Sequence, residues 1–189
     1  MDLRTAAADT GTKARTRRAI LDAAVTVLTA DPAASLADIA AAAGVGRTTV
    51  HRYFPERADL TTALQQMGWE HVVQATRRAR LTEGTGADGL DRLCQEYFDL
   101  GNVLMLVFNY SDPDGDVTWD CDPDNQSVLD LITRGHHDGS IDPTLTGPWI
   151  RDVLWALLYV AWQQSRTGVA SRHQALDSCL RALHKVVAP

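Results

Sequence analysis

Hydrogen-bond donors gather in one short run near the first quarter of the chain. The run comprises Arg47, Thr48, Thr49, His51 and Arg52. Val50 and Phe54 stand four residues apart, so a helix here turns both inward and leaves all these donors but Thr49 on its outer face. Arginine pairs with guanine edges or phosphates, and threonine reaches a thymine methyl or a phosphate. This face is typical of a surface that binds nucleic acid.

The residues before this run predict the element that positions it. Ser35 is a candidate N-cap, and the apolar residues after it recur at helical spacing. They are Leu36, Ile39, Ala40 and Ala43. Gly44 then suits the left-handed residue that ends a helix, and Val45 suits a core contact that sets the angle between two helices. Two short helices around a glycine turn, the second with exposed donors, follow the helix-turn-helix plan.

These details resemble the helix-turn-helix of the TetR family of transcriptional repressors, over roughly residues 13–60. The resembling residues are Leu36, Ile39, Ala40, Ala43-Gly44-Val45, Thr49-Val50, Tyr53-Phe54 and Pro55-Glu56-Arg57-Ala58-Asp59-Leu60. The resemblance implies an all-α fold with an N-terminal three-helix DNA-binding domain and a C-terminal helical domain for ligand binding and dimerisation. It also implies a ligand-responsive regulator, a repressor, that binds a palindromic operator as a homodimer. We expect half-sites about one helical turn apart.

Further DNA-binding residues extend this face. Besides the five donors we expect Ser35, Tyr53, Arg57, Lys13 and Arg17 to contact DNA, with Arg57 and the stretch 13–18 on phosphates. Two positions depart from the family pattern. Members commonly carry Tyr where His51 stands, so His51 can add pH dependence, and they often have Arg or a hydroxyl where Ala37 stands, so fewer contacts are available.

Charge is distributed unevenly along the 189 residues. The net charge is −6, but residues 1–60 hold eight Lys/Arg against seven Asp/Glu, and the remainder has a balance of −7. A local basic surface beside an acidic body can still bind phosphate. No apolar run reaches transmembrane length, and the N-terminus lacks the apolar core of a signal peptide, so we expect a cytoplasmic protein and no membrane partner.

Helical periodicity divides the chain into three parts: an arm over 1–12 that we expect to be disordered, the DNA-binding domain over 13–60, and the ligand-binding and dimerisation domain over 61–189. The expected helices outside the helix-turn-helix cover 13–30, 56–79, 89–109, 124–137, 148–167 and 172–187. The helix over 148–167 has two apolar stripes, one formed by Trp155, Tyr159 and Trp162. With the last helix it predicts a homodimer interface.

The domain over 61–189 has more aromatic and apolar side chains than one thin bundle needs. Those we expect to line an inducer cavity are Trp69, Phe98, Met105, Phe108, Trp119, Trp155, Tyr159 and Trp162, and Tyr97 belongs to the same set. Core packing or the dimer interface is the alternative for each of them. Because no cationic or metal-ligand cluster accompanies them, we expect an uncharged or cationic hydrophobic molecule, unidentified.

Catalytic and metal-binding patterns are missing from the sequence. The aspartates over 110–123 fit no EF-hand loop, His136 and His137 are adjacent and do not share a helix face, and the three cysteines form neither a disulfide framework nor a zinc pattern. We expect no metal, no cofactor and no enzymatic activity. The alternative function is a helical small-molecule-binding or enzymatic protein in which the helix-turn-helix is only a scaffold.

Overall fold

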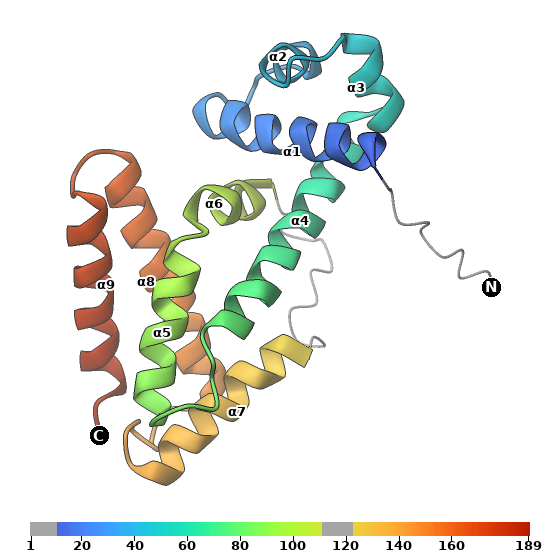
Figure 1. Cartoon of the computed structure of the whole chain (residues 1–189). Coiled ribbons are helices and arrows are strands. Elements are labelled where there is room, and N and C mark those ends of the chain that lie inside the picture. Colours follow the sequence, from blue (N-terminus) through green and yellow to red (C-terminus); the bar gives the residue numbers. More distant parts are fainter. Residues whose placement is uncertain (1–10, 111–122) are drawn as a thin grey trace. The chain divides into compact units, whose positions relative to one another are not determined.

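The computed structural model describes residues 11–110 and 123–189, with backbone only for 107–110 and 123–125. Within these residues the chain forms helices and no strand, which confirms the all-α prediction. In chain order (Figure 1) the helices are α1 (Thr12–Ala30), α2 (Leu36–Ala42), α3 (Arg47–Tyr53), α4 (Arg57–Arg78), α5 (Gly86–Phe98), α6 (Gly101–Tyr110), α7 (Pro123–Asp138), α8 (Gly147–Arg166) and α9 (Arg172–Val187). The chain divides into two compact units, Met1–Gln66 and Met67–Pro189.

The first unit packs three helices and the start of α4 around a small apolar core. From α1 it buries Ile20, Leu21, Ala24 and Leu28, and from the later elements Ile39, Val50, Phe54 and Leu60. Val27 of α1 is only half-buried. The predicted arm over 1–12 falls outside the described residues except at its end, where α1 already begins at Thr12.

Both ends of α2 follow the sequence signals. Ser35 caps the helix: its hydroxyl accepts from the Asp38 amide at 3.3 Å, and the Asp38 carboxylate accepts from the Ser35 amide at 2.8 Å. Gly44 has φ +66°, the left-handed conformation that favours glycine, and Val45 N–H then bonds the Ala40 carbonyl. The tight reversal between α2 and α3 therefore comes from local backbone geometry.

The second unit is a bundle in which α5, α8 and α9 pack on one another, α7 packs on α5 and α8, and α6 packs on α8. Its core is almost wholly apolar, with Leu90, Leu93, Ile132, Leu154 and Leu183 fully buried. Where α5 crosses α7, Gly86 and Gly135 meet backbone to backbone, so a side-chain carbon at Gly86 would overlap Gly135. The crossing requires glycine at that point.

One predicted helix, 89–109, is in fact two. It starts earlier, at Gly86, because Thr85 and Asp88 form a capping box, and it is interrupted at Asp99 and Leu100. At the interruption the Trp162 indole donates to the Phe98 carbonyl at 3.0 Å, and the same ring fills the space beside Gly101. A contact from α8, 64 residues away, thus ends α5, and periodicity within the segment gave no sign of it.

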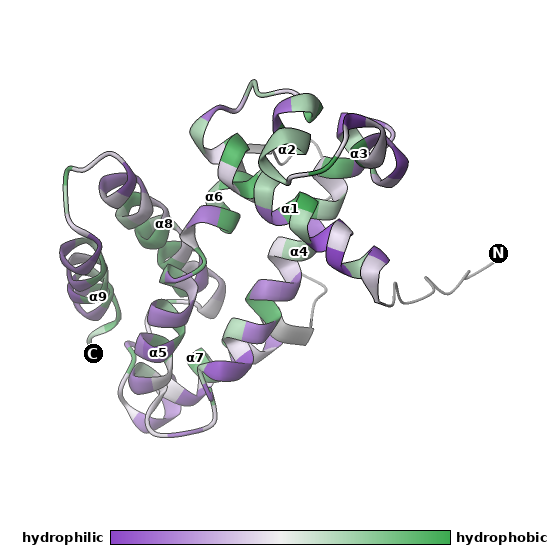
Figure 2. Cartoon of the chain, turned by 45° about the horizontal axis from the view of Figure 1, so that its top comes forward, coloured by the Kyte–Doolittle hydropathy of each residue, from purple (hydrophilic) through white to green (hydrophobic). Residues whose placement is uncertain are grey.

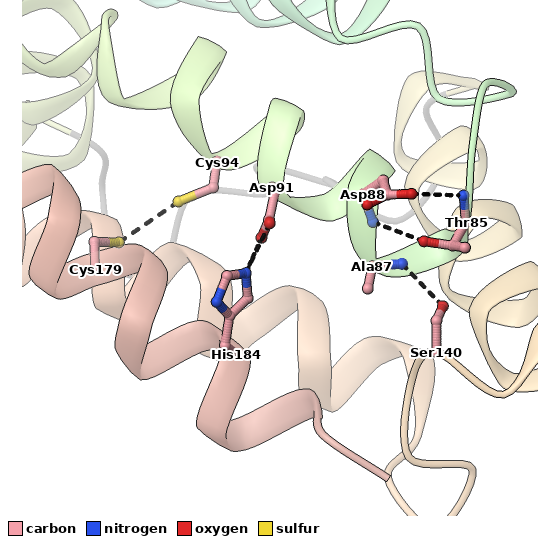
Figure 3. Close-up of polar contacts among 8 residues, drawn as sticks. All are labelled: Thr85, Ala87, Asp88, Asp91, Cys94, Ser140, Cys179 and His184. Carbon is pink, nitrogen blue, oxygen red and sulfur yellow. Dashed lines mark hydrogen bonds and ion pairs between the residues drawn. The ribbon is translucent and has the colours of Figure 1, made fainter.

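Polar contacts tie α5 to its neighbours (Figure 3). Asp91 pairs with His184 of α9 at 2.7 Å, and the Ala87 amide donates to the Ser140 hydroxyl at 3.0 Å. Cys94 and Cys179 are free buried thiols with their sulfur atoms 3.6 Å apart. Donation of the Cys94 proton to Cys179, together with burial, raises the pKa of Cys94. Cys121 and most of the acidic stretch over 110–123 lie outside the described residues.

Metal sites and membrane-spanning helices are both absent from the part of the chain that the structure describes. It contains no group of three or more His, Cys, Asp or Glu side chains arranged to hold a metal ion. None of the helices described has both the length and the apolar character needed to cross a membrane.

Candidate nucleic-acid interface

The outer face of α3 is polar and open to solvent. Arg47, Thr48, His51 and Arg52 are exposed, and Val50 is fully buried beneath them. Figure 2 shows this contrast as a largely hydrophilic α3 beside the more hydrophobic α1 and α2. The four exposed donors therefore share one surface of the first unit, as the spacing predicts.

Aromatic residues at the end of α3 hold nearby cations. The Arg52 guanidinium lies 5.6 Å from the centre of the Tyr53 ring, and that of Arg17 lies 5.6 Å from the centre of the buried Phe54 ring. Such contacts fix the stem of an arginine while its N–H groups stay available. Arg17 on α1 and Arg52 on α3 are thus both anchored through the same pair of adjacent aromatic residues.

Arg57 has a different position from the one expected for a phosphate ligand. Its guanidinium donates to the Ala34 carbonyl at 2.6 Å and to the Pro32 carbonyl at 2.8 Å, both in the loop between α1 and α2. The side chain is half-buried and joins this loop to the start of α4. The geometry therefore supports a positioning role for Arg57, and the phosphate role expected from the sequence has no support in it.

Two other predicted contacts lie at helix starts. Ser35 is exposed but its hydroxyl also donates to the Asp38 carboxylate at 2.7 Å, so it acts first as a cap. Hydrogen bonds from the Ser35 hydroxyl and then the Ser35 amide lower the pKa of Asp38. Lys13 is exposed in the first turn of α1, and Thr49 and Tyr53 are half-buried. These positions leave Lys13 on the surface of the first unit and Thr49 at the edge of the α3 face.

The predicted inducer residues of the second unit do not form one surface. Phe98, Met105 and Trp162 are buried in the core, Trp69 and Trp155 are half-buried, and Tyr159 is 38% exposed. The side chain of Phe108 and the whole of Trp119 lie outside the described residues. The stripe of Trp155, Tyr159 and Trp162 is therefore divided between a ring stack, the surface and the core.

A buried polar pair that was not among the predicted site residues lies beside these aromatic side chains. Thr76, the one buried polar residue among those described, donates its hydroxyl proton to the Val72 carbonyl at 2.9 Å. Its oxygen lies 2.8 Å from the Tyr97 hydroxyl, which must therefore be the donor. Tyr97 stacks on Trp155 with ring centres 4.8 Å apart. Thr76 stands on an otherwise apolar face of its helix, and this was the one feature of the sequence that could have indicated the buried pair.

A cavity of about 560 Å³ opens in the second unit near the end of α4. Its lining is Thr76, Arg77, Arg80, Leu81, Thr82, Glu83, Ser127, Asp130, Leu131 and Arg134. None of the eight predicted inducer residues is among them, and five of the ten lining residues are charged. One lining residue, Thr76, links the cavity to the aromatic side chains through its hydrogen bond with Tyr97.

Comparison with known proteins identifies the family. A family model described as "Bacterial regulatory proteins, tetR family" matches residues 20–64. Over 179 residues the chain is 37% identical to the HTH-type transcriptional repressor LfrR of Mycolicibacterium smegmatis, covering 93% of this chain and 92% of LfrR. This chain belongs to the TetR family. As a TetR-type transcriptional repressor it is a member of a non-enzyme family, which sets the enzymatic alternative aside.

Other proteins are similar to this chain in sequence or in fold. The regulator NfxB of Pseudomonas aeruginosa is 28% identical over 74% of this chain and 77% of its own length. The crystal structure of LfrR in complex with proflavine covers 95% of this chain and 99% of LfrR, with 34% identity and a TM-score of 0.74. A FadR regulator from Bacillus subtilis, at 16% identity and a TM-score of 0.67, shares the fold.

Proposed function

We propose that this TetR-type repressor binds a palindromic DNA operator as a homodimer and leaves it when a hydrophobic molecule binds the second unit. The observation that carries the DNA-binding part is the exposed donor face of α3 over a buried Val50. Residues 13–60 act as the DNA-binding domain, and residues 61–189 bind the inducer and the second subunit. A repressor of this kind works beside the chromosome, in the cytoplasm.

The proposed contacts divide by chemistry. Arg47 and Thr48 are the first two residues of α3, and the N-terminal residues of a recognition helix are the ones that read base edges. Arg52 on α3 and the α1 cations Lys13 and Arg17 contact phosphates. Ser35, at the start of α2, lies on the same exposed unit and contacts a phosphate. Arg57 supports these residues indirectly by holding the loop between α1 and α2.

Selection from a random pool of DNA duplexes, followed by anisotropy titration, tests the DNA-binding proposal. We expect a palindromic sequence to be enriched. Arg47→Ala should lose about 1–3 kcal/mol of preference at one base pair. Arg52→Ala should instead weaken all sequences alike and reduce the salt slope by about 1 per half-site. Failure to enrich any sequence would sink the proposal.

Apolar surface on α8 and α9 supports the homodimer. Trp149 is 58% exposed and Val160 is 52% exposed, and with Val153 they follow one face of α8. Leu176 and Leu180 of the adjacent α9 are half-buried. Two neighbouring amphipathic helices of this kind suit an isologous four-helix interface. The sequence predicted these helices but not the exposure of Trp149.

Sedimentation tests the dimer directly. We expect a dimer at micromolar concentration and a monomer for Val160→Glu, because a buried unpaired carboxylate is costly at an interface. Gln95→Glu, which adds the same charge on the exposed face of α5, is the control and should stay dimeric. A wild-type protein that sediments as a monomer would contradict the dimer proposal.

The stack of Tyr97 and Trp155 supports the inducer site. A flat apolar molecule, uncharged or cationic, can replace or extend such a stack, and LfrR has been crystallised with proflavine, which is flat and cationic. The Thr76 and Tyr97 hydroxyls add one polar contact inside an apolar core. Of the other predicted residues, Phe98, Met105 and Trp162 belong to the same core cluster and Trp69 packs against it, so these four remain the proposed surroundings.

Proflavine is the probe for this site. Its affinity should fall when Trp155→Ala removes half of the stack, whereas Val169→Ala, 76% exposed in the turn between α8 and α9, should leave it unchanged. Coupling between sites is reciprocal, so operator DNA must weaken proflavine binding by the same factor as proflavine weakens DNA binding. Equal proflavine affinities with and without DNA would show that proflavine is not an inducer.

A further inference from the structure

His51 has one partner in the part of the chain that the structure describes, and that partner fixes its chemistry. Its Nδ1 lies 3.3 Å from the carbonyl oxygen of Pro55, the residue that follows α3 by two positions. A carbonyl oxygen only accepts, so Nδ1 must carry a proton in this contact. In the neutral ring the other nitrogen, Nε2, is then a lone-pair acceptor.

The exposed edge of His51 is therefore an acceptor when neutral and a donor only when the ring is protonated. A DNA phosphate has oxygen acceptors and no donor at neutral pH, so neutral His51 gives it no hydrogen bond. Protonated His51 offers both a charge and an Nε2–H, the stronger, charge-assisted kind of contact. Tyrosine at this position would donate at any pH near neutrality, because its hydroxyl keeps its proton.

The place of His51 in α3 favours phosphate over base. The N-terminal residues of a recognition helix reach base edges, and here these are Arg47 and Thr48. His51 lies in the last turn, with its ring drawn further towards the helix end by Pro55. A ring held at that end is directed away from the residues that read bases.

Within the described residues, the charged groups on the neighbouring elements make no hydrogen bond or ion pair with His51. They are Arg47 and Arg52 on α3, Arg17 on α1, Asp38 on α2, and Glu56, Arg57 and Asp59 at the start of α4. Arg17 lies over Phe54, Asp38 bonds Ser35, and Arg57 bonds the loop carbonyls of Pro32 and Ala34.

We propose that His51 makes DNA binding proton-linked: each subunit takes up a proton on Nε2, keeps it, and donates a hydrogen bond from Nε2–H to a backbone phosphate oxygen. This inference rests on the proposed DNA-binding function and adds a regulation to it. The sign follows from the chemistry. DNA favours the protonated ring, so affinity rises as pH falls through the range of about pH 8 to 5 in which histidines titrate.

The test uses the DNA duplex that the wild-type chain enriches from a random pool, with anisotropy titrations from pH 8.0 to 5.5 at constant ionic strength. For each half-site we expect Kd to fall about tenfold, the size of one charge-assisted hydrogen bond. The salt slope should also steepen by about 1 per half-site at the acidic end.

Variants assign this effect to one ring. His51→Gln and His51→Tyr should bind with little pH dependence, since neither side chain titrates in this range. His137→Gln is the matched control. The His137 ring is also held through Nδ1, at 2.7 Å from the Thr133 carbonyl, but on α7 in the second unit. It should keep the wild-type pH dependence.

The outcomes separate this inference from the proposed function. If a duplex is enriched but wild type and His51→Gln bind it with the same pH dependence, the inference is wrong. The proposal of DNA binding then still holds. Affinity that falls as pH falls means that neutral His51 accepts from a base amino group, and also overturns it. Nitrogen NMR of the free protein must show the Nδ1–H tautomer. If no duplex is enriched, the proposed function and this inference fail together.

Discussion

The two units use their polar side chains in different ways. In the first unit they bond mainly to backbone or side chains close in sequence, as Ser35 does with Asp38 and His51 with Pro55. In the second unit they join helices far apart in sequence, as Thr76 does with Tyr97 and Trp162 with the Phe98 carbonyl. The first arrangement leaves one face of donors open to a partner. The second arrangement puts hydrogen bonds inside an apolar bundle, where each one links two distant segments of the chain.

Backbone contact in the second unit gives the largest expected effect. Gly86→Ala should destabilise that unit by about 3 kcal/mol, because the new carbon overlaps Gly135 and forces α5 and α7 apart. Gly46→Ala, in the first unit, meets no atom closer than 3.8 Å and should cost about 1 kcal/mol or less, the penalty of alanine at an N-cap. Urea unfolding followed by tryptophan fluorescence measures the former selectively, since every tryptophan lies after residue 66. Equal costs would contradict the close crossing.

Variants of the Thr76–Tyr97 pair test which of the two hydroxyl groups donates the buried hydrogen bond of the second unit. Thr76→Val removes the buried oxygen that accepts from the Tyr97 hydroxyl and should cost about 1–3 kcal/mol. Tyr97→Phe should cost less, about 1 kcal/mol, because Thr76 keeps its bond to the Val72 carbonyl. The same urea titration compares them. A larger loss for Tyr97→Phe would reverse the donor assignment.

Variants of Arg57 test whether its contact with the loop between α1 and α2 stabilises the first unit. Arg57→Ala should destabilise this unit by about 1–2 kcal/mol, since two carbonyls lose a charged donor. Arg57→Lys keeps the charge but not the fork that spans both carbonyls, so it should be destabilised nearly as much. Circular dichroism during urea unfolding provides the stability, and titration with DNA at several salt concentrations provides the slope. If Arg57→Lys had the stability of the wild type and the same salt slope of DNA binding, charge alone would be sufficient at this position. That result would favour contact of Arg57 with a phosphate.

Capping boxes are common to both units and give the smallest effect, a pH dependence of stability. Hydrogen bonds from the N-cap side chain and then its amide lower the pKa of Asp38 in α2 and of Asp88 in α5. A lowered folded pKa means stability that is present above 3.8, the ordinary value, and lost as pH falls through the folded value. Thermal melting from pH 6 to 2.5 should show a smaller loss for Asp38→Asn than for wild type. Identical profiles would show that the box contributes nothing in solution.

Local chemistry allowed most of the first unit to be predicted. A serine cap, an apolar stripe and a glycine after it define α2 and its end within a few residues, and Gly44 does adopt the left-handed conformation. The spacing of Val50 and Phe54 was enough to place the donors of α3 on the outside. The two-carbonyl contact of Arg57 was not predictable, because its partners lie 23 and 25 residues earlier.

The sequence by itself thus determined the helical class, the helix-turn-helix and its exposed donors, since these depend on residues within one or two turns of each other. Tertiary structure alone decided where α5 ends, which aromatic rings stack and which threonine is buried. The indole of Trp162, the ring of Trp155 and the hydroxyl of Tyr97 meet partners on other helices. Periodicity gives the face on which a side chain lies, but the atom it meets depends on how helices distant in the chain pack together.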